Sequence, residues 1–223
     1  MGNIVKVSAS DGHTLGAYRA DPAGTPRGAI VLIQEIFGVN DHIRKVCDGY
    51  ARDGYICVAP AVFDRVSKDI QLGYGPDDVK VAMETRGKLN WDDVLKDVDA
   101  ARDEVADAGK VGVIGYCFGG SVAWLAATRL NFACAVSYYG GNVADFANEK
   151  PNCPIICHIG AQDKAITAEK VEIIRSKRPE VKIYLYDGAP HAFNNDAREG
   201  SYHAPSAKLA RERTIDFLKA NVG

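Results

Sequence analysis

The sequence predicts an α/β fold in which a mostly parallel central sheet carries helices on both faces and begins with an antiparallel hairpin. Short apolar strand segments alternate with helical segments along the chain, which is the pattern of sheets whose parallel strands are joined by helices. Several strand segments are continuously apolar, as strands buried on both faces are. Near the start of the chain, Asp11-Gly12 separates two strand segments and forms a hairpin turn signal.

The expected elements follow one another without a repeat, a low-complexity tract or a linker, so we predict a single domain over residues 1–223. Strands are expected at residues 6–10, 14–18, 29–33, 55–59, 111–115, 134–138, 154–159 and 181–186. Helices are expected at residues 41–53, 91–108, 121–130, 168–177 and 205–220. Asn40 or Asp41 caps the first helix and Gly54 ends it. Residues 64–90 are polar and irregular, and we expect a loop or a short helix there, a candidate lid.

Composition excludes several classes of protein. A chain of 223 residues that is 47% hydrophobic and 25% charged has the composition of an ordinary globular protein. Its net charge of −2 provides no basic surface for nucleic acid or an anionic membrane. We find no apolar run of about 18–20 residues, the length that spans a bilayer, and no secretory signal. The expected partner is therefore a small-molecule substrate, and the expected state is a monomer or a small homo-oligomer.

Cysteine usage points to a reducing compartment. The six cysteines are spread along a chain that carries no secretory signal, so we expect thiols in the cytoplasm rather than disulfides. The only close pair is Cys153 and Cys157, and no second pair or His-x₃-His completes a zinc site. No metal or other cofactor is expected.

The segment Gly115-Tyr116-Cys117-Phe118-Gly119 lies where a strand gives way to a helix. A sharp turn of this kind needs small neighbours, and G-x-C-x-G is the nucleophile elbow with cysteine in the serine position. The helix N-terminus favours thiolate over thiol, and the Phe118 N–H faces a developing oxyanion. The alternatives are a phosphate-binding turn and an inert buried cysteine. Neither G-x-G-x-x-G nor the Lys-Ser/Thr of a P-loop supports the first.

A nucleophile elbow predicts an acid and then a histidine later in the chain. Asp163 follows the strand expected at 154–159, and His191 follows the strand expected at 181–186. Both side chains are therefore expected at the carboxyl ends of strands, where α/β sheets bind ligands. The remaining histidines fit this role less well. We interpret His13, His42 and His203 as surface or capping residues and His158 as a core residue.

A carboxylate directly after the apolar strand at 29–33 is a further unusual feature. Glu35 in this position is unfavourable unless it faces a site or a cation. The same loop supplies the second oxyanion donor in this kind of fold, for which the Ile36 N–H is the candidate. The alternative is that Glu35 is an ordinary surface residue.

Several segments together resemble the dienelactone hydrolase (carboxymethylenebutenolidase) family, a branch of the α/β-hydrolase fold. The resemblance spans essentially the whole chain and rests on SDGHTLGAY (10–18), QEIFGVN (34–40), GYCFGG (115–120), YYG (138–140), GAQD (160–163), GAPHAF (188–193) and ERTIDFL (212–218). It implies a catalytic triad of Cys117, Asp163 and His191. It also implies that Glu35 contacts a resting thiol that points away from the histidine, and that substrate binding displaces this carboxylate so that it takes the thiol proton.

The resemblance implies acyl transfer on a lactone, of the dienelactone-to-maleylacetate type in the catabolism of aromatic compounds. The family binds the substrate carboxylate with arginines, but this chain has Asn195 at one of these positions. The candidate substrate contacts are Arg198, Asn195, Lys80, Arg86, Phe37 and Tyr138. Two alternatives stay open: a thiol esterase acting on an uncharged ester or another lactone, and a thiol sensor or binding protein without catalytic activity.

Overall fold

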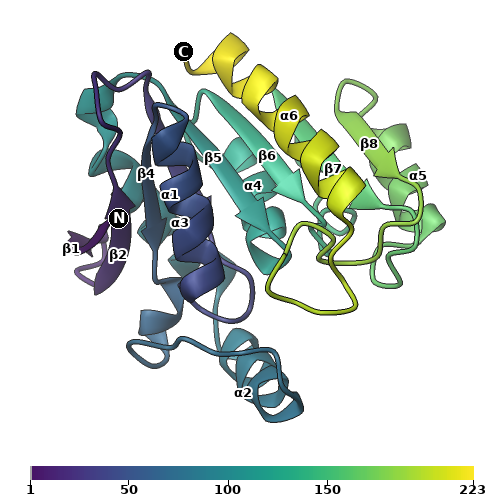
Figure 1. Ribbon diagram of the computed structural model, residues 1–223, viewed down its shortest axis with the longest axis horizontal. Coiled ribbons are helices and arrows are strands. Elements are labelled where there is room, and N and C mark those ends of the chain that lie inside the picture. Colours follow the sequence, from purple (N-terminus) through teal and green to yellow (C-terminus); the bar gives the residue numbers. More distant parts are fainter. Residues whose placement is uncertain (1) are drawn as a thin grey trace. The chain divides into compact units, whose positions relative to one another are not determined.

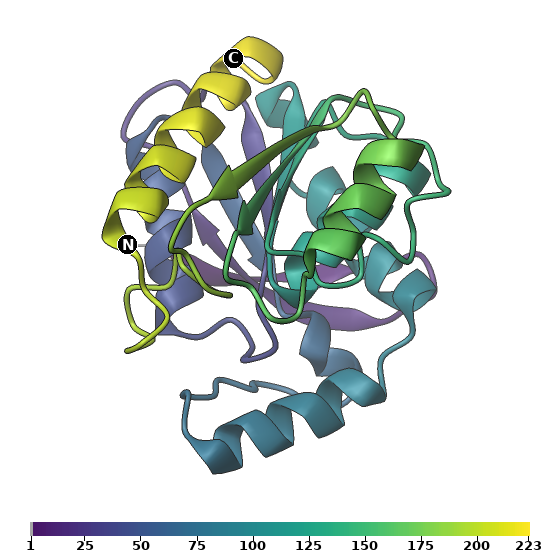
Figure 2. The same ribbon diagram turned by 90° about the vertical axis from the view of Figure 1, so that its right-hand side faces the viewer.

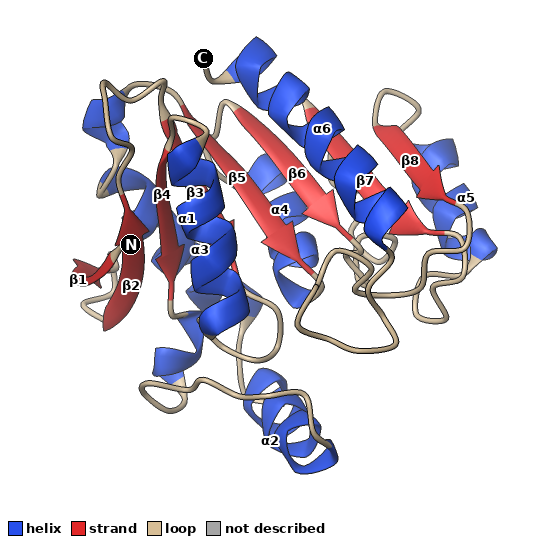
Figure 3. Cartoon of the chain, viewed as in Figure 1, coloured by secondary structure: helices blue, strands red, loops and turns tan. Residues whose placement is uncertain are grey.

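A computed structural model describes residues 2–223 (Figure 1). The chain divides into two compact units, one that runs to Gly112 and includes Val222, and one that comprises Val113–Asn221 and Gly223. The prediction of a single domain over residues 1–223 remains a prediction. Figure 3 shows helices and strands in both units. From residue 29 onwards strands and helices mostly alternate along the chain, as the hydrophobic pattern predicts.

The first unit holds the antiparallel hairpin and two further strands. Its strands are β1 (Asn3–Ser8), β2 (Thr14–Ala20), β3 (Ala29–Ile33) and β4 (Ile56–Pro60), which lie in the order β1-β2-β4-β3. The β1/β2 and β2/β4 pairs are antiparallel and the β3/β4 pair is parallel. The register places Ser8 opposite Thr14, so Asp11 and Gly12 lie in the turn as predicted.

The helices of the first unit are α1 (Asp41–Arg52), α2 (Pro76–Gly87) and α3 (Trp91–Asp103), with short 3₁₀ turns η1 (Val62–Arg65) and η2 (Ala106–Ala108). The predicted cap of α1 is Asn40, whose side chain accepts a hydrogen bond from the Ile43 N–H. The helix predicted over 91–108 ends at Asp103, and the chain then continues as the short turn η2.

The segment 64–90 is more regular than its polar sequence suggests. Helix α2 occupies twelve of its residues, so the helical alternative is the one found. The helix begins with proline in its first turn, and the Asp78 carboxylate accepts a hydrogen bond from the Gly75 N–H. Only Ala82 and Thr85 are buried, so α2 has no continuous apolar face. The periodicity that reveals packed helices is therefore missing here.

The second unit contains three strands, most of a fourth strand that begins two residues before it, and three helices. The elements are β5 (Val111–Tyr116), α4 (Phe118–Arg129), β6 (Cys134–Tyr138), β7 (Ile155–Gly160), α5 (Ala168–Lys177), β8 (Lys182–Tyr186) and α6 (Ala204–Asn221). Its strands lie in the order β5-β6-β7-β8, and the β6/β7 and β7/β8 pairs are parallel. Figure 2 shows α5 and α6 on opposite faces of these strands, so the prediction of helices on both faces is confirmed for this unit.

Strands β5, β6 and β7 are buried throughout, which agrees with their continuously apolar sequences. Helix α4 begins at Phe118, three residues before the predicted start, because the strand-to-helix turn occupies a single residue. The carboxyl ends of parallel strands lie at the same edge of a sheet, so the loops after β5, β7 and β8 lie close together in this unit.

Candidate active site

Cys117 occupies the sharp turn between β5 and α4. Its backbone angles, φ of 55° and ψ of −113°, lie in a region that residues other than glycine rarely adopt. A Cβ on Gly115 would lie 1.8 Å from the Gly119 carbonyl oxygen, so the turn has no room for a side chain there. The Cys117 N–H donates to the Tyr138 carbonyl at 3.0 Å, which ties the turn to the end of β6. This is the geometry that the G-x-C-x-G spacing predicts.

His191 lies between the thiol and a carboxylate, and all three residues belong to the second unit. Its Nε2 is 3.2 Å from Cys117 Sγ, and its Nδ1 is 2.7 Å from Asp163 Oδ2. Asp163 follows β7 and His191 follows β8, as predicted. The three side chains, named here the triad, therefore form one continuous hydrogen-bonded line.

Asp163 has both carboxylate oxygens engaged. Oδ1 accepts hydrogen bonds from the backbone N–H groups of Ala165 (2.8 Å) and Ile166 (3.2 Å), while Oδ2 faces the imidazole. The Asp163 side chain is fully buried, whereas a quarter of the His191 side chain is exposed. The carboxylate is acceptor-only when ionised, so it fixes the Nδ1–H tautomer and leaves Nε2 to face the sulfur.

The charged form of His191 is favoured by its partners. Burial lowers the pKa of the imidazole, but hydrogen bonds to Asp163 and Cys117 outweigh burial and raise it to about 10. An imidazolium held between a carboxylate and a sulfur stabilises a thiolate at that sulfur. The site can therefore supply a thiolate nucleophile and a group that donates and accepts protons beside it.

The thiol orientation differs from the resting state that the resemblance implies. There the sulfur points away from the histidine, whereas here Sγ faces His191 Nε2. The arrangement is the one expected once the thiolate has turned towards the base. Phe118 opens α4 directly after Cys117, so its N–H belongs to the first turn of the helix, where backbone donors stabilise negative charge.

The loop after β3 in the first unit contains Gln34, Glu35, Ile36 and Phe37. Glu35 is only 1% exposed, so the alternative of an ordinary surface residue is wrong. Gln34 Nε2 donates to the Glu35 carbonyl at 3.2 Å, which stiffens the loop. The Phe37 ring packs edge-on against Tyr74 with centroids 4.8 Å apart. The coupling of Glu35 and Ile36 to Cys117 in the second unit remains a prediction.

The predicted substrate contacts lie in varied surroundings. Lys80 is exposed on α2. The Arg86 guanidinium lies 4.1 Å from the Trp91 ring centroid, and burial lowers its pKa. Asn195 is fully buried and its Oδ1 accepts from the Ala197 N–H at 3.0 Å. Arg198 directly follows Ala197 in the same loop and is half-buried.

Tyr138 was expected to contact substrate, but the structure places it in the core. Its side chain is fully buried, and its hydroxyl lies 2.6 Å from Thr214 Oγ1. Its ring stacks on Tyr116 with centroids 4.6 Å apart. A substrate would have to displace this packing to reach Tyr138. The residue that follows it, Tyr139, was missed by sequence reasoning and packs against His191.

The other histidines do not join the triad. His158 is fully buried and its ring nitrogens lie 2.7 Å from Tyr186 Oη and 3.1 Å from Thr214 Oγ1, which confirms the prediction of a core residue. Burial lowers its pKa to about 3. His42 is buried in α1, so its interpretation as a surface or capping residue is wrong. His42 lies in the first turn of α1, which begins at Asp41 as predicted, and its side chain is buried there.

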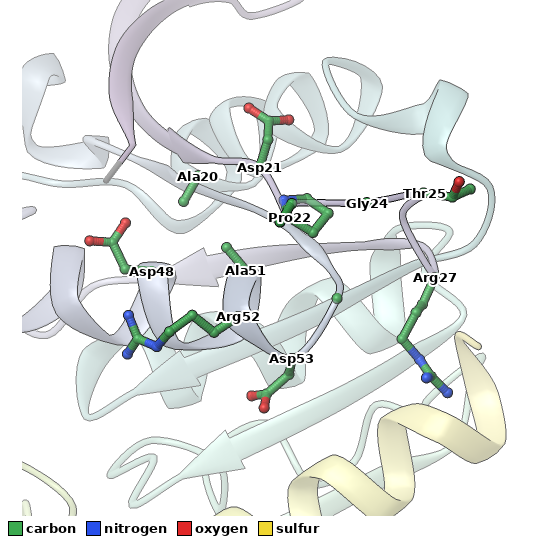
Figure 4. A pocket seen from close by; sticks show the side chains of 12 residues that line it. Ala20, Asp21, Pro22, Gly24, Thr25, Arg27, Asp48, Ala51, Arg52 and Asp53 are labelled. Atoms are coloured by element: carbon green, nitrogen blue, oxygen red, sulfur yellow. The ribbon is translucent and has the colours of Figure 1, made fainter.

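A separate hollow of about 700 Å³ lies on the first unit, between the segment after β2 and the end of α1 (Figure 4). Its charged lining includes Asp21, Arg27, Asp48 and Asp53. Figure 4 shows Asp21, Arg27 and Asp53 pointing in different directions rather than towards one point, whereas ligand sites bring a few polar groups together. Within residues 2–223, no group of three or more His, Cys, Asp or Glu side chains could hold a metal ion.

No helix in residues 2–223 is both long and apolar enough to cross a membrane. Fold and site together define the chain as an ester-hydrolysing enzyme of the α/β-hydrolase fold. It belongs to the dienelactone hydrolase family, whose model matches residues 15–222.

Individual relatives agree with this family. The chain is 32% identical to a carboxymethylenebutenolidase of Pseudomonas putida over 226 residues, which cover 96% of this chain and 94% of the relative. A crystal structure described as a candidate dienelactone hydrolase from Klebsiella pneumoniae is 31% identical with a TM-score of 0.84, covering 97% and 98% of the two chains. An esterase of Pyrococcus furiosus is 17% identical with a TM-score of 0.74, covering 100% and 93%, and shares the fold.

Proposed function

We propose that the protein is a cysteine-dependent hydrolase that opens a lactone ring through a thioester formed on Cys117. The observation that carries this proposal is the placement of His191 between Cys117 Sγ at 3.2 Å and Asp163 Oδ2 at 2.7 Å. Nucleophilic catalysis requires a nucleophile within hydrogen-bond reach of a base, and a third group that orients the base. The sulfur at the strained strand-to-helix turn, the histidine and the buried carboxylate are arranged in this way. A purely structural cysteine needs no such arrangement.

The first half of the reaction acylates the enzyme. The Cys117 thiolate attacks the lactone carbonyl carbon, and the carbonyl oxygen becomes an oxyanion. The N–H groups of Phe118 and Ile36 are our candidates for stabilising this oxygen. The tetrahedral intermediate then expels the ring oxygen, which leaves as an enolate when it is conjugated to a diene. A thioester to Cys117 remains, and the opened chain stays attached through it.

The second half releases the product. Acylation removes the contribution of Cys117 to the raised pKa of His191. The neutral imidazole then accepts a proton from a water molecule, which attacks the thioester carbonyl, and the thiolate leaves. Asp163 keeps Nδ1 protonated and stabilises the imidazolium that forms. Thiolates are expelled readily, so this site suits activated esters and lactones better than amides. Glu35, buried in the loop after β3, is our candidate for accepting the thiol proton when substrate binds.

We propose a carboxylated lactone of the dienelactone type as substrate, with maleylacetate-type products. The relative from Pseudomonas putida named carboxymethylenebutenolidase supports this class. Arg198 is our candidate for the carboxylate, because guanidinium pairs with carboxylate in a bidentate fashion. The second candidate function is hydrolysis of an uncharged ester. It is favoured by Asn195, a fully buried, uncharged side chain at a position where the resemblance implies an arginine. The thiol-containing sequence supports a cytoplasmic setting.

Turnover of a dienelactone by matched cysteine variants tests the reaction. We expect Cys117→Ala to lose at least about 10³-fold in kcat/KM, because the nucleophile is gone. Cys153→Ala is the control: it removes a half-buried thiol outside the triad and is expected to retain full activity. Turnover by Cys117→Ala at the rate of the unaltered enzyme would contradict the proposal.

Charged and neutral substrates of equal reactivity test the substrate class. We expect Arg198→Ala to raise KM for a carboxylated lactone by about 10-fold or more and to leave the KM of a neutral ester unchanged. Arg175→Ala, an exposed arginine on α5, is the matched control. An unchanged KM for the carboxylated lactone in Arg198→Ala would instead favour the uncharged-ester function.

A further inference from the structure

Unusual backbone conformations gather around the triad. Within residues 2–223, four residues other than glycine have a positive φ: Asp69, Cys117, Tyr139 and Ala192. Three of these adjoin the triad, since Cys117 belongs to it, Ala192 follows His191, and Tyr139 contacts the His191 ring. Strained backbone persists only where the surroundings impose it, and it gathers at functional sites. The nucleophile turn explains Cys117, but nothing in the reaction described so far explains Tyr139.

Tyr139 is fully buried directly after β6. Its ring centroid lies 5.1 Å from that of His191 at an interplanar angle of 61°, and 5.4 Å from that of Phe193. It also lies 6.1 Å from the ring of Tyr116, the residue before the nucleophile. One side chain thus contacts the imidazole, the segment that follows it and the strand that delivers Cys117.

The backbone holds this ring in place. A φ of 39° is rare for a bulky aromatic residue. The Tyr139 N–H donates to the His158 carbonyl of β7 at 2.8 Å. On the other side, a Cβ on Gly140 would lie 2.7 Å from Ser137 Oγ and 2.8 Å from the carbonyl carbon of Gly120 in α4. The turn is therefore fixed between β7 and α4 and cannot relax to an extended conformation.

The turn also separates two adjacent tyrosines. The Tyr138 hydroxyl contacts Thr214 of α6, whereas the ring of Tyr139 contacts His191. In a regular strand, neighbouring side chains point to opposite faces of the sheet. At Tyr139 the positive φ turns the chain away from the strand direction, and the ring lies against His191. The strained conformation thus has a consequence for the imidazole that an ordinary strand end would lack.

We propose that Tyr139 is a positioning residue for His191, which holds the imidazole in the plane that joins Asp163 to Cys117. Hydrogen bonds at Nδ1 and Nε2 fix the two ends of the ring, and the edge-to-face contact with Tyr139 restricts its rotation about the line between them. This inference rests on the proposed function.

The aromatic contact also bears on the ionisation of the Cys117 thiol. The titratable groups that face the imidazole are the Asp163 carboxylate, the Cys117 thiol and the Tyr139 phenol. If the imidazole moves when this contact is lost, it stabilises a thiolate at Cys117 less well.

Two substitutions of Tyr139 test the proposal, with kcat, KM and the pH dependence of Cys117 alkylation by iodoacetamide as readouts. Tyr139→Phe keeps the ring and is expected to keep most of kcat. Tyr139→Leu removes it and is expected to lower kcat by about 10- to 100-fold with little change in KM, because a misplaced base slows the chemical step. The alkylation profile of Tyr139→Leu should also move to higher pH by about 0.5–1 unit, because a displaced imidazole stabilises the thiolate less.

Two further variants separate positioning from packing. Tyr50→Leu removes a fully buried tyrosine from α1, and we expect it to lower the melting temperature while kcat and the alkylation profile stay unchanged. Asparagine tolerates a positive φ, so the variant Tyr139→Asn should keep the turn. Because it lacks the ring, it should lose activity as Tyr139→Leu does. It also tests the proposal should Tyr139→Leu fail to fold.

The proposal is overturned if folded Tyr139→Asn or Tyr139→Leu shows the kcat and alkylation profile of the unaltered enzyme while Cys117→Ala is inactive. If Cys117→Ala itself turns over substrate normally, the proposed function fails and the positioning claim fails with it. The two failures are therefore distinguished by one additional variant.

Discussion

Both carboxylate oxygens of Asp163 are used to hold the triad in place. Its two oxygens accept hydrogen bonds from two backbone N–H groups and from His191 Nδ1. The backbone donors prevent the carboxylate from rotating, so the imidazole meets an acceptor in a fixed direction. This arrangement sets the tautomer that leaves Nε2 to act on Cys117.

Asp163→Asn tests this reading. An asparagine can keep an oxygen towards the backbone donors only by turning its NH₂ group towards His191, which would impose the wrong tautomer. We expect kcat to fall by about 10³- to 10⁴-fold while the fold is retained. Asp187→Asn, at an exposed carboxylate after β8, is the control and should stay fully active. Wild-type kcat in Asp163→Asn would contradict the assignment.

At the scale of residues, the sequence predicts the triad and misses its support. Cys117, Asp163 and His191 could be found because the elbow spacing, the chain order and the strand ends are all visible in a sequence. Tyr139 could not, because the positive φ that turns it towards His191 depends on packing against Gly120 and Ser137. The pair Tyr138-Tyr139 before two glycines was a signal, but it does not say which ring faces the site.

Helix α6 is joined to the sheet of the second unit by a buried polar cluster. Thr214 Oγ1 lies 2.6 Å from Tyr138 Oη and 3.1 Å from His158 Nε2, and His158 Nδ1 lies 2.7 Å from Tyr186 Oη. The cluster connects α6 to β6, β7 and β8. Because His158 is neutral, each of its nitrogens is either donor or acceptor, and the hydroxyl of Thr214 completes the chain.

Thr214→Val tests the contribution of this hydroxyl. The substitution keeps the side-chain shape and leaves Tyr138 Oη and His158 Nε2 without their buried partner. We expect it to lower the free energy of unfolding by about 1–3 kcal/mol, measured by urea denaturation. Thr128→Val, at a half-buried threonine of α4, should cost less because water can replace the lost partner. Equal stability of Thr214→Val and the unaltered protein would rule out this role.

In the first unit, a buried ion pair joins α3 to the 3₁₀ turn η1. Asp97 of α3 is 0% exposed and meets the Arg65 guanidinium of η1 through two hydrogen bonds of 2.7 Å. Burial raises the pKa of Asp97, and Arg65 offsets only part of this shift. The pair is therefore poorly suited to add net stability, but the loss of one partner leaves a buried charge.

Arg65→Met is expected to destabilise the protein by about 3–5 kcal/mol, whereas the double variant Arg65→Met/Asp97→Leu should recover most of this loss. Urea denaturation of the single and double variants measures both values. A double variant no more stable than Arg65→Met would contradict this expectation, because the unpaired Asp97 carboxylate would then not account for the loss.

Elements with an apolar face were the predictable part of the fold. The strands and α1 lie within three residues of their predicted bounds, and most of the strands are buried as their hydrophobic pattern predicts. Helix α2 lacks such a face, and its only signals are Gly75-Pro76 and the acidic residues of its first turn. The early end of α3 at Asp103 depends on how the chain turns into η2, which periodicity does not report.

For the molecule as a whole, two histidines give opposite pH dependences of stability. His158 has a pKa of about 3 when folded, below its ordinary value, because burial disfavours its charge. The unfolded chain then binds the extra proton, so stability falls as the pH drops below about 6.5. His191 has a pKa of about 10 when folded. There the folded state binds the extra proton, so stability falls as the pH rises from about 6.5 towards 10.

We therefore expect the free energy of unfolding to be greatest near neutral pH, with slopes of at most about 1.4 kcal/mol per pH unit from either histidine. Urea denaturation between pH 4 and 10 would measure this. The variant His191→Gln should flatten the alkaline side and leave the acidic side unchanged. An alkaline slope that persists unchanged in His191→Gln would show that another group is responsible.

The most direct test of the account is the identity of the atom that carries the acyl group during turnover. A dienelactone reaction stopped rapidly in acid and analysed by peptide mass spectrometry should show the substrate mass added to the peptide that contains Cys117. Hydroxylamine should remove the adduct, as expected for a thioester, and Cys117→Ala should lack it. An acyl adduct on any other residue, or undiminished turnover by Cys117→Ala, would contradict the account.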